Sequence, residues 1–400
     1  MFSRRVPEPH AVNRFSRRIE ERRRSGGSIL DLTESNPTRC GFVYESEVIL
    51  RAIGSPASLV YEPHPQGLPS AREAIADSYR DQGVTVEPDA LFLTSGTSEA
   101  YGHIFKLLAD PEDEVLVPVP GYPLLEVLTR LDSVRLVHYP LRYGADRGWR
   151  IDLERLGISI STRTRAIVVV SPNNPTGSFL KQDELAAIAL LCRRHGLALI
   201  VDEVFSGYGM GSDSSRVVTA AGYSAALTFV LNGFSKMLGL PQIKLSWIHV
   251  SGPEDLRMQA CERLGFVTDA YLSVGAPVMN AAPLLLRGRE ALQTQIRERL
   301  WENEQQLRSL LRRAEGVEVL VREGGWYAVV RLPDDIGDED VVLGLLDGEG
   351  VLVHPGFFYD FPGGSHLVIS LLPPADMFRE GAARILDWLE RMKAAGRPQP

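Results

Sequence analysis

Three polar groups follow apolar, strand-like runs in the sequence. Lys236 comes shortly after residues 226–231, Asp202 follows residues 198–201, and the loop Ser171-Pro-Asn-Asn-Pro-Thr-Gly177 follows a third run. A lysine amine, a carboxylate and a loop amide suit a pyridine-aldehyde cofactor. The amine holds such a cofactor as a Schiff base, and the acid keeps its ring nitrogen protonated. The combination predicts a binding site for pyridoxal 5′-phosphate.

Each of these residues has an ordinary interpretation when it is taken alone. Lys236 would be a solvated surface lysine, because lysine is almost never buried without a partner. Asp202 would be a strand-end carboxylate that caps a turn. Only the combination favours the cofactor site, in which Lys236 is the covalent anchor and proton shuttle and Asp202 is the partner of the pyridinium nitrogen.

A phosphate-binding segment is predicted at residues 94–100, Thr-Ser-Gly-Thr-Ser-Glu-Ala, which follow a strand-like run and open a helix. The free amides and the positive end of that helix suit a phosphate group. An ordinary helix N-cap explains the same residues equally well. The candidate phosphate ligands are Gly96, Thr97, Ser98, Ser235 and Lys244.

The elements that must position these residues alternate between strand-like and helix-like segments. Such alternation predicts an α/β fold with a mostly parallel sheet that helices cover on both faces. Ligands of such sheets bind beyond the carboxyl ends of the strands, where Asp202 and Lys236 are expected. The predicted strands are 90–94, 114–118, 166–170, 198–201, 227–231 and 245–250, and the predicted helices are 97–108, 122–131 and 183–195.

The chain length predicts two domains. Four hundred residues exceed the roughly 250 to 300 at which a single core stops growing. After about residue 287 the pattern changes to a long polar helix at 293–314 and short strands at 327–331, 351–354 and 367–371. We therefore expect a large domain at 46–287 and a smaller α+β domain formed by 1–45 and 288–400.

Charge and cysteine content exclude several classes of protein. A net charge of −8 and a pI near 5.6 argue against binding nucleic acid or anionic membranes. No apolar run is long enough for a signal peptide or for a membrane span. Cys40, Cys192 and Cys261 are widely spaced and match no metal-ligand pattern. These features predict a cytoplasmic protein that binds no metal.

Four motifs together resemble the class I and II aminotransferases, which are fold-type I pyridoxal phosphate enzymes. They are Asn232-Gly-Phe-Ser-Lys236, Asp202-Glu-Val-Phe205, the loop 171–177, and Tyr61 followed by Gly67 and Ala71-Arg72. Gly324-Gly-Trp326 and Pro355-Gly356 extend the resemblance over nearly the whole chain. It implies a seven-stranded, mostly parallel sheet in the large domain. It also implies transfer of an amino group from an amino acid or amine to a keto acid through a Schiff base at Lys236.

The resemblance also implies individual roles. Asp202 would pair with the pyridinium nitrogen, and Asn174 would bind the 3′ oxygen of the ring and approach a substrate carboxylate. Tyr122 would stack on the ring; the alternative is a turn aromatic packed on the core. Tyr61 would reach the phosphate in the partner subunit, which implies a homodimer with shared active sites.

The sequence departs from the family pattern at three positions. Phe205 stands where the family has a tyrosine that donates to the 3′ oxygen, and Lys244 stands where an arginine binds the phosphate. Val368 stands where an arginine binds the substrate α-carboxylate. Two alternatives follow: another cation, with Arg39 as the candidate, binds the carboxylate, or the substrate has no α-carboxylate. His354 and His366 are further candidates.

Two other functions are compatible with the same scaffold, because a fold does not determine the reaction type. One is a pyridoxal phosphate lyase or another eliminating or cyclising enzyme. The other is a non-catalytic regulatory protein, which the acidic charge and the absence of a DNA-binding module in the sequence disfavour.

Overall fold

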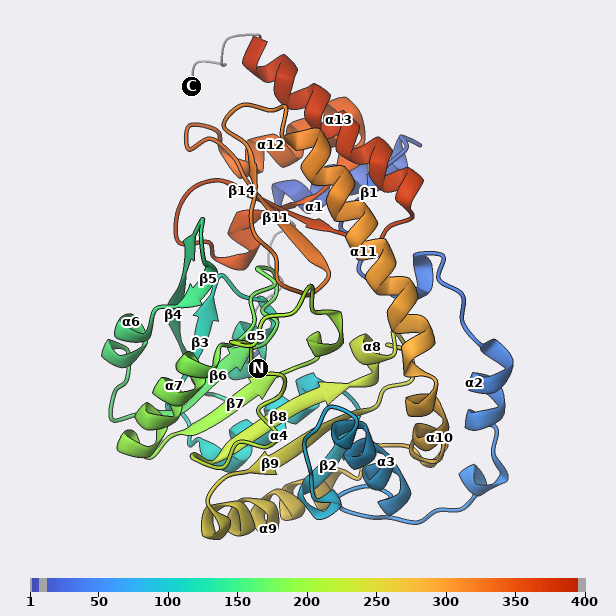
Figure 1. Cartoon of the computed structure of the whole chain (residues 1–400), viewed down its shortest axis with the longest axis vertical. Coiled ribbons are helices and arrows are strands. Elements are labelled where there is room, and N and C mark those ends of the chain that lie inside the picture. The colour runs from blue at the N-terminus through green and yellow to red at the C-terminus, as the bar shows by residue number, and fades with distance from the viewer. Residues whose placement is uncertain (1, 7–12, 395–400) are drawn as a thin grey trace.

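Two β-sheets organise the chain, as the computed structural model of residues 2–6 and 13–394 shows (Figure 1). An eight-stranded sheet is formed by residues 91–251, and a four-stranded sheet is formed by residues 318–370. This arrangement is the predicted α/β sheet with a second α+β unit. Of the ranges predicted for the small domain, residues 1, 7–12 and 395–400 lie outside the described part of the chain.

The large sheet has eight strands rather than the seven that the resemblance implied. The pairs from β8 through β7, β6 and β3 to β4 are parallel, whereas β9 runs antiparallel to both β2 and β8, and β5 runs antiparallel to β4. β5 forms an antiparallel hairpin with β4 at one edge. In spatial order the strands are β2 (Leu91–Thr94), β9 (Ser246–Ser251), β8 (Thr228–Gly233), β7 (Ala198–Asp202), β6 (Thr164–Val170), β3 (Glu114–Val119), β4 (Arg135–Gly144) and β5 (Gly148–Ile151).

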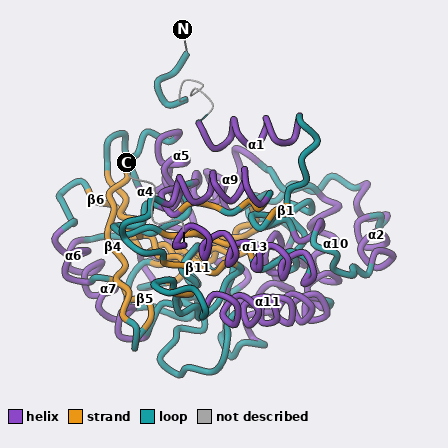
Figure 2. The backbone as a smooth tube through the Cα atoms, turned by 90° about the horizontal axis from the view of Figure 1, so that it is seen from above, coloured by secondary structure: helices purple, strands orange, loops and turns teal. Residues whose placement is uncertain are grey.

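Helices cover both faces of this sheet, as the view from above shows (Figure 2). Alternate residues of β6 and β7 belong to two different clusters. Ala166 and Ala198 pack toward α4, α5 and α9, whereas Ile167 and Leu199 pack toward the side that contains α3, α7 and α10. Every residue of β7 and β8 is buried, as a central parallel strand requires. The helices of this part are α2 (Ser46–Ile53), α3 (Pro69–Arg80), α4 (Thr97–Leu108), α5 (Leu124–Leu131), α6 (Leu153–Ile158), α7 (Gln182–His195), α8 (Phe234–Met237), α9 (Glu254–Tyr271) and α10 (Ala276–Arg287).

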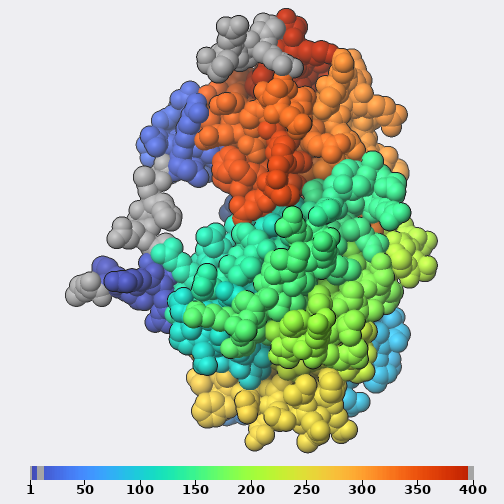
Figure 3. Space-filling view, turned by 90° about the vertical axis from the view of Figure 1, so that its left-hand side faces the viewer, coloured from blue at the N-terminus to red at the C-terminus, as the bar shows by residue number. Residues whose placement is uncertain are grey.

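The smaller sheet is antiparallel and has the order β10-β11-β14-β13. The N-terminal segment contributes to this end of the molecule, because β1 pairs in parallel with β12 and α1 contacts α12. Figure 3 shows these C-terminal residues, in orange and red, at one end of the molecule. The elements are α1 (Arg14–Arg24), β1 (Leu30–Asp31), α11 (Arg289–Leu311), β10 (Glu318–Val319), β11 (Tyr327–Arg331), α12 (Asp338–Gly344), β12 (Val351–Leu352), β13 (His354–Pro355), β14 (His366–Ser370) and α13 (Ala375–Ala394).

No helix among the described residues is long and apolar enough to cross a membrane. The three cysteines are free thiols, and Cys40 and Cys192 are buried. No group of three or more potential metal ligands lies together in the described part of the chain.

A buried ion-pair cluster joins α11 to the segment before β11. The carboxylate of Glu304 accepts hydrogen bonds from the guanidinium groups of Arg322, at 2.6 and 3.0 Å, and of Arg308, at 2.8 and 3.0 Å. The side chains of Glu304 and Arg322 are only 3% and 2% exposed. Because both charges are removed from water, each depends on the other for compensation.

We expect Glu304→Gln to destabilise the protein by about 3–5 kcal/mol, because it leaves the buried Arg322 without its anion. The measurement is the free energy of unfolding from urea denaturation. The matched control is Glu20→Gln, since Glu20 pairs with Arg24 on exposed side chains, and exposed pairs of this type contribute about 0.3–0.5 kcal/mol. Equal losses in the two variants would contradict this prediction.

Candidate active site

Lys236 lies in α8, directly beyond the end of β8. Its Nζ atom lies 4.7 Å from the ring centroid of Trp326 and 5.6 Å from that of Phe205. Burial among these aromatic rings disfavours the ammonium form and lowers the pKa of Lys236 to about 8, although the charge of Asp202 opposes the shift. The amine is therefore much more nucleophilic near neutral pH than that of an ordinary surface lysine.

Lys236 and Lys244 differ from the other lysines of the chain. The chain has five lysines, and Lys106, Lys181 and Lys393 each form an ion pair with a carboxylate. Lys236 and Lys244 form no ion pair with any carboxylate of the described residues. Their amines therefore remain available to a ligand.

Asp202 ends β7, the strand beside β8, and its carboxylate is buried. One oxygen accepts a hydrogen bond from the hydroxyl of Tyr101 at 3.0 Å, and the other accepts one from the amide of Val204 at 3.2 Å. Burial raises the pKa of Asp202 to about 6, while these hydrogen bonds and the charge of Lys236 act in the opposite direction. A cationic ring nitrogen beside Asp202 would favour the carboxylate further.

The amine of Lys244 lies beside the start of α4. Gly96 is the N-cap residue, and no side chain caps this helix. A Cβ atom at position 96 would lie 3.7 Å from Nζ of Lys244, so the amine lies close to the open end of the helix. Lys244 has a φ of 57°, a left-handed backbone conformation that is uncommon outside glycine and that often marks a functional site. An uncapped helix start and an unpaired amine make a suitable binding site for a phosphate.

The loop of residues 171–177 presents a buried amide. Oδ1 of Asn174 is buried and has no hydrogen-bond partner among the described residues. A buried polar atom of this kind requires a partner, and a ligand can supply it. The loop packs closely against the segment before β11, because a Cβ atom at Gly177 would lie 2.4 Å from the carbonyl oxygen of Gly324.

The structure places the remaining predicted site residues in three different settings. Phe205 is buried, with its ring 5.3 Å from that of Trp326. Tyr122 and Tyr61 are 49% and 79% exposed. Arg39 also lies at the surface, and its Nη1 is 3.9 Å from Oε2 of Glu34. In the chain, Ser235 directly precedes Lys236, and Thr97 and Ser98 directly follow Gly96.

Sequence reasoning assigned no role to Tyr101 or Trp326. Tyr101 lies in the second turn of α4, and its spacing identifies only the buried face of that helix. Trp326 was noted only as part of the resemblance. Both residues are distant in the sequence from the residue that they approach: Tyr101 from Asp202, and Trp326 from Lys236.

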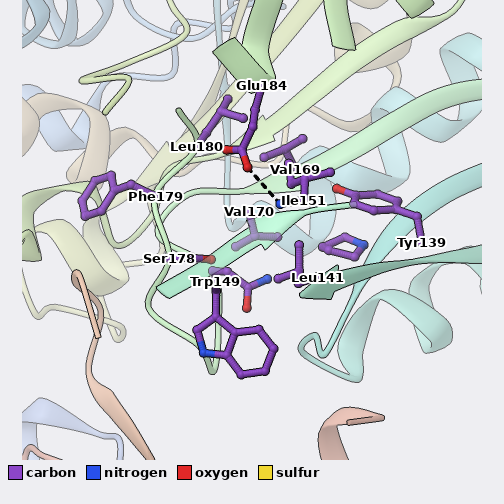
Figure 4. A pocket seen from close by; sticks show the side chains of 12 residues that line it. Tyr139, Leu141, Trp149, Ile151, Val169, Val170, Ser178, Phe179, Leu180 and Glu184 are labelled. Carbon is purple, nitrogen blue, oxygen red and sulfur yellow. Dashed lines mark hydrogen bonds between the residues drawn. The ribbon is translucent and has the colours of Figure 1, made fainter. Parts of the chain in front are cut away.

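A further cavity lies behind the loop of residues 171–177 and is shown in Figure 4. It is lined mostly by apolar side chains of β4, β5 and β6, including Tyr139 and Trp149. Glu184 on its rim accepts a hydrogen bond from the amide of Ile151 at 2.9 Å. None of the predicted site residues lines this cavity.

The chain is similar to several known proteins over most of its length. Residues 46–385 match the family model described as aminotransferase class I and II. The alanine aminotransferase of Mycobacterium tuberculosis is 30% identical over 372 residues, which cover 90% of this chain and 85% of that protein. The glutamate-pyruvate aminotransferase AlaA of Escherichia coli K12 is 29% identical over 374 residues, which cover 91% and 90% of the two chains.

Solved structures share the whole fold. An alanine aminotransferase from Pyrococcus furiosus superimposes with a TM-score of 0.87 at 24% identity and covers 98% of this chain and 100% of its own. An aminotransferase from Escherichia coli superimposes with a TM-score of 0.85 at 25% identity and covers 99% and 100% of the two chains.

Proposed function

Because the chain belongs to the class I and II aminotransferase family, we propose that this aminotransferase works with pyridoxal phosphate bound covalently to Nζ of Lys236. The resemblance seen in the motifs is thereby confirmed, and so is the fold class. The observation that carries the proposal is the unpaired, partly buried amine of Lys236 beside the buried carboxylate of Asp202.

The residues present fit the cofactor at each of its functional groups. Lys236 offers the amine and Asp202 offers the anion for the ring nitrogen. Gly96, Thr97, Ser98, Ser235 and Lys244 would hold the phosphate, and Asn174 and Tyr122 would contact the ring. When bound, the cofactor supplies an electron sink for the bond electrons released at the amine-bearing carbon of the substrate.

Lys236 and Asp202 have separate tasks in the reaction. With the cofactor bound, the free Nζ of Lys236 would accept the proton from the amine-bearing carbon of the substrate and would deliver it to the former aldehyde carbon of the cofactor, which is general acid–base catalysis. A pKa near 8 allows this amine to act in both directions near neutral pH. Asp202 would hold its negative charge toward the ring nitrogen, and the rings of Phe205 and Trp326 would keep water away from the amine.

We further propose a homodimer with shared active sites in the cytoplasm. Tyr61 supports the dimer because its phenol is largely exposed in the single chain and lines a groove with Leu272 and Val274. The free cysteines support a reducing compartment. The reactants are a small amino donor and a keto acid acceptor, without nucleic acid or membrane partners.

The test is a spectral screen of the purified holoenzyme with candidate amino donors. Transamination converts the cofactor absorbance to that of pyridoxamine phosphate and releases a carbonyl product in equal amount. Release of ammonia without accumulation of pyridoxamine phosphate would instead identify an eliminating enzyme. An unchanged spectrum with every donor would contradict the proposal.

Tyr101 provides a test of the role of Asp202. We expect Tyr101→Phe to raise the pKa of Asp202, because a hydrogen bond donated to its carboxylate is lost. A hydrogen bond to a charged group contributes about 1.5–3 kcal/mol, or about one to two pKa units. The acidic limb of the kcat/KM profile therefore moves to higher pH by about one unit, since Asp202 must be ionised.

The control for this experiment is Tyr79→Phe, which removes another buried phenol, one that accepts a hydrogen bond from Trp247. This variant should leave the acidic limb in place. A Tyr101→Phe profile that superimposes on the wild-type profile would exclude Tyr101 as a positioning residue for Asp202.

A further inference from the structure

Helix α8, which carries Lys236, has only four residues. The last carbonyl groups of a helix have no partner within it, so a helix of this length depends on donors from other elements for its position. The hydroxyl of Tyr208 donates to the carbonyl oxygen of Lys236 at 2.6 Å, and the side-chain amide of Gln293 donates to that of Met237 at 2.8 Å. The first of these bonds fixes the backbone from which the Lys236 side chain extends.

Tyr208 is held where its phenol can make this bond. It ends the short turn Ser206–Tyr208, which follows Asp202 and Phe205 beyond the end of β7. Its amide donates to the carbonyl oxygen of Phe205 at 3.0 Å. Tyr208 is 1% exposed, and burial raises the pKa of its phenol far above the usual range. The hydroxyl therefore stays protonated and acts as a hydrogen-bond donor.

The ring of Tyr208 contacts the aromatic group that lies against the amine. Its centroid lies 5.2 Å from that of Trp326, at an interplanar angle of 66°. The same indole is contacted by Phe205, and its ring centroid lies 4.7 Å from Nζ of Lys236. Edge-to-face contacts of this kind favour one orientation of the two rings. Tyr208 thus acts on Lys236 at two places, on its backbone through the hydroxyl and on its amine through Trp326.

The segment after β7 is also fixed to the segment before β11. The amide of Met210 donates to the carbonyl oxygen of Glu323 at 2.7 Å. Arg216 bridges the same two residues, because its guanidinium donates to the carboxylate of Glu323 at 3.3 Å and to the carbonyl oxygen of Met210 at 2.5 Å. A Cβ atom at Gly324 would lie 2.9 Å from the carbonyl oxygen of Tyr208, so the two backbones approach closely. These contacts keep the phenol ring and the indole ring together.

The position of the amine matters for the proposed proton transfer. A general base must lie within about 2.6–3.2 Å of the group whose proton it accepts, and a displacement of about 1 Å can lower a rate by about 10²-fold. Lys236 forms no ion pair with the described residues that would orient its amine. Its position therefore depends on its backbone and on the rings around it.

We infer that Tyr208 is a positioning residue for Lys236: its hydroxyl fixes the backbone that carries the amine, and its ring holds Trp326 against that amine. This inference rests on the proposed aminotransferase function, in which the amine moves a proton at the substrate carbon. Tyr208 acts through Lys236 and not on the substrate itself. Two variants separate the two contributions, because one removes the hydroxyl and the other removes the ring.

The first test uses Tyr208→Phe, which removes the hydroxyl and retains the ring. The control is Tyr139→Phe, because Tyr139 is also buried and donates to a backbone carbonyl, that of Val168, at 2.7 Å. We measure single turnovers of the holoenzyme with the amino donor that reacts fastest in the spectral screen. We expect the rate constant of Tyr208→Phe to fall by about 10- to 10²-fold, with KM within about 3-fold of wild type.

The control variant should keep the wild-type rate constant. A smaller fraction of folded enzyme would lower the amplitude of the reaction and not its rate constant, so the two causes are distinguishable. A Tyr208→Phe rate constant within about 3-fold of wild type, or an equal loss in Tyr139→Phe, would overturn the role of the hydroxyl.

The second test is independent of turnover and concerns the ring. Trace acetylation of the apoprotein with acetic anhydride, followed by peptide mapping, reports the pH at which the amine of Lys236 loses its proton. This midpoint should lie near pH 8 in wild type and in Tyr208→Phe, because the ring still excludes water. Tyr208→Leu removes the ring and admits water, so the midpoint should rise by about one unit or more toward the value of an exposed lysine, about 10.4. Asp202, whose charge also acts on the amine, is retained in both variants.

Tyr139→Leu is the control for a ring lost elsewhere in the core, and it should leave the midpoint near pH 8. A midpoint that is the same in Tyr208→Leu and in wild type would overturn the role of the ring. Thermal denaturation shows whether each variant is folded at the temperature of the experiment. Failure of every donor to react with the wild-type holoenzyme would contradict the proposed function, whereas the acetylation result would still decide whether Tyr208 controls the surroundings of Lys236.

Discussion

Lys236→Ala abolishes transamination and leaves no lysine that can replace the lost amine. General acid–base catalysis alone contributes about 10²–10⁴ in rate, and the covalent anchor is lost as well. We therefore expect turnover to fall by at least about 10⁴-fold. Lys244, the other lysine without an ion pair among the described residues, lies at the start of α4, where it would be occupied by the phosphate.

The site of attachment can be measured independently of turnover. Borohydride reduction of the wild-type holoenzyme should add the cofactor mass to the peptide that contains Lys236, and Lys236→Ala should show no such adduct. Because the chain has only five lysines, peptide mapping assigns the adduct without ambiguity. Lys244→Gln is the control, since it should still be labelled at Lys236 although it binds the cofactor more weakly. An adduct at any other lysine would contradict the proposed site.

The pKa of Lys236 adds a dependence on pH. The free amine is the nucleophile, and burial lowers its pKa to about 8. The rate at which the apoprotein combines with the cofactor aldehyde should therefore rise with pH and reach half of its maximum near pH 8. A midpoint above pH 10, the value of an exposed lysine, would show that the amine is not buried in the apoprotein.

Asp202→Ala is expected to have the second largest effect. Without a carboxylate opposite it, the ring nitrogen loses its proton near neutral pH, and the cofactor becomes a poorer electron sink. Removal of a preorganised electrostatic partner in an active site commonly costs about 10²–10³ in kcat. We expect a loss of at least this size in the single-turnover rate, with the Schiff base at Lys236 still formed.

The matched control for Asp202 is its neighbour in the chain. Glu203 is also buried, and its carboxylate accepts hydrogen bonds from Thr219 and from the amide of Ala220, both at 2.7 Å. Glu203→Gln should therefore lower stability and leave the single-turnover rate of the folded enzyme within about 10-fold of wild type. Equal rate losses in the two variants would show that Asp202 acts only through the fold.

The sequence alone determined the central elements that hold the proposed catalytic groups. β7 and β8 are continuous apolar runs because both of their faces are buried, and α4 and α7 show helical patterns with clear ends. Local propensity and burial favour the same structure in these segments. For this reason, the positions of Asp202 and Lys236 at strand ends could be predicted without the tertiary structure.

The edges of the large sheet could not be predicted in the same way. The sequence of β4 mixes polar and apolar residues and contains Pro140, which disfavours a strand assignment from the pattern alone. The antiparallel direction of β9 depends on its neighbours β2 and β8 and not on its own residues. Strand direction and edge pairing are properties of the whole sheet.

Tertiary structure also decided which residues complete the site. Tyr101 contacts Asp202 across 101 positions of sequence, and Trp326 approaches Lys236 from the segment directly before β11. The motifs indicated the proposed chemistry because they place a carboxylate and an amine at or just after the ends of two neighbouring strands. The partners of these groups were decided only by folding, because they come from distant parts of the chain that long-range packing brings together.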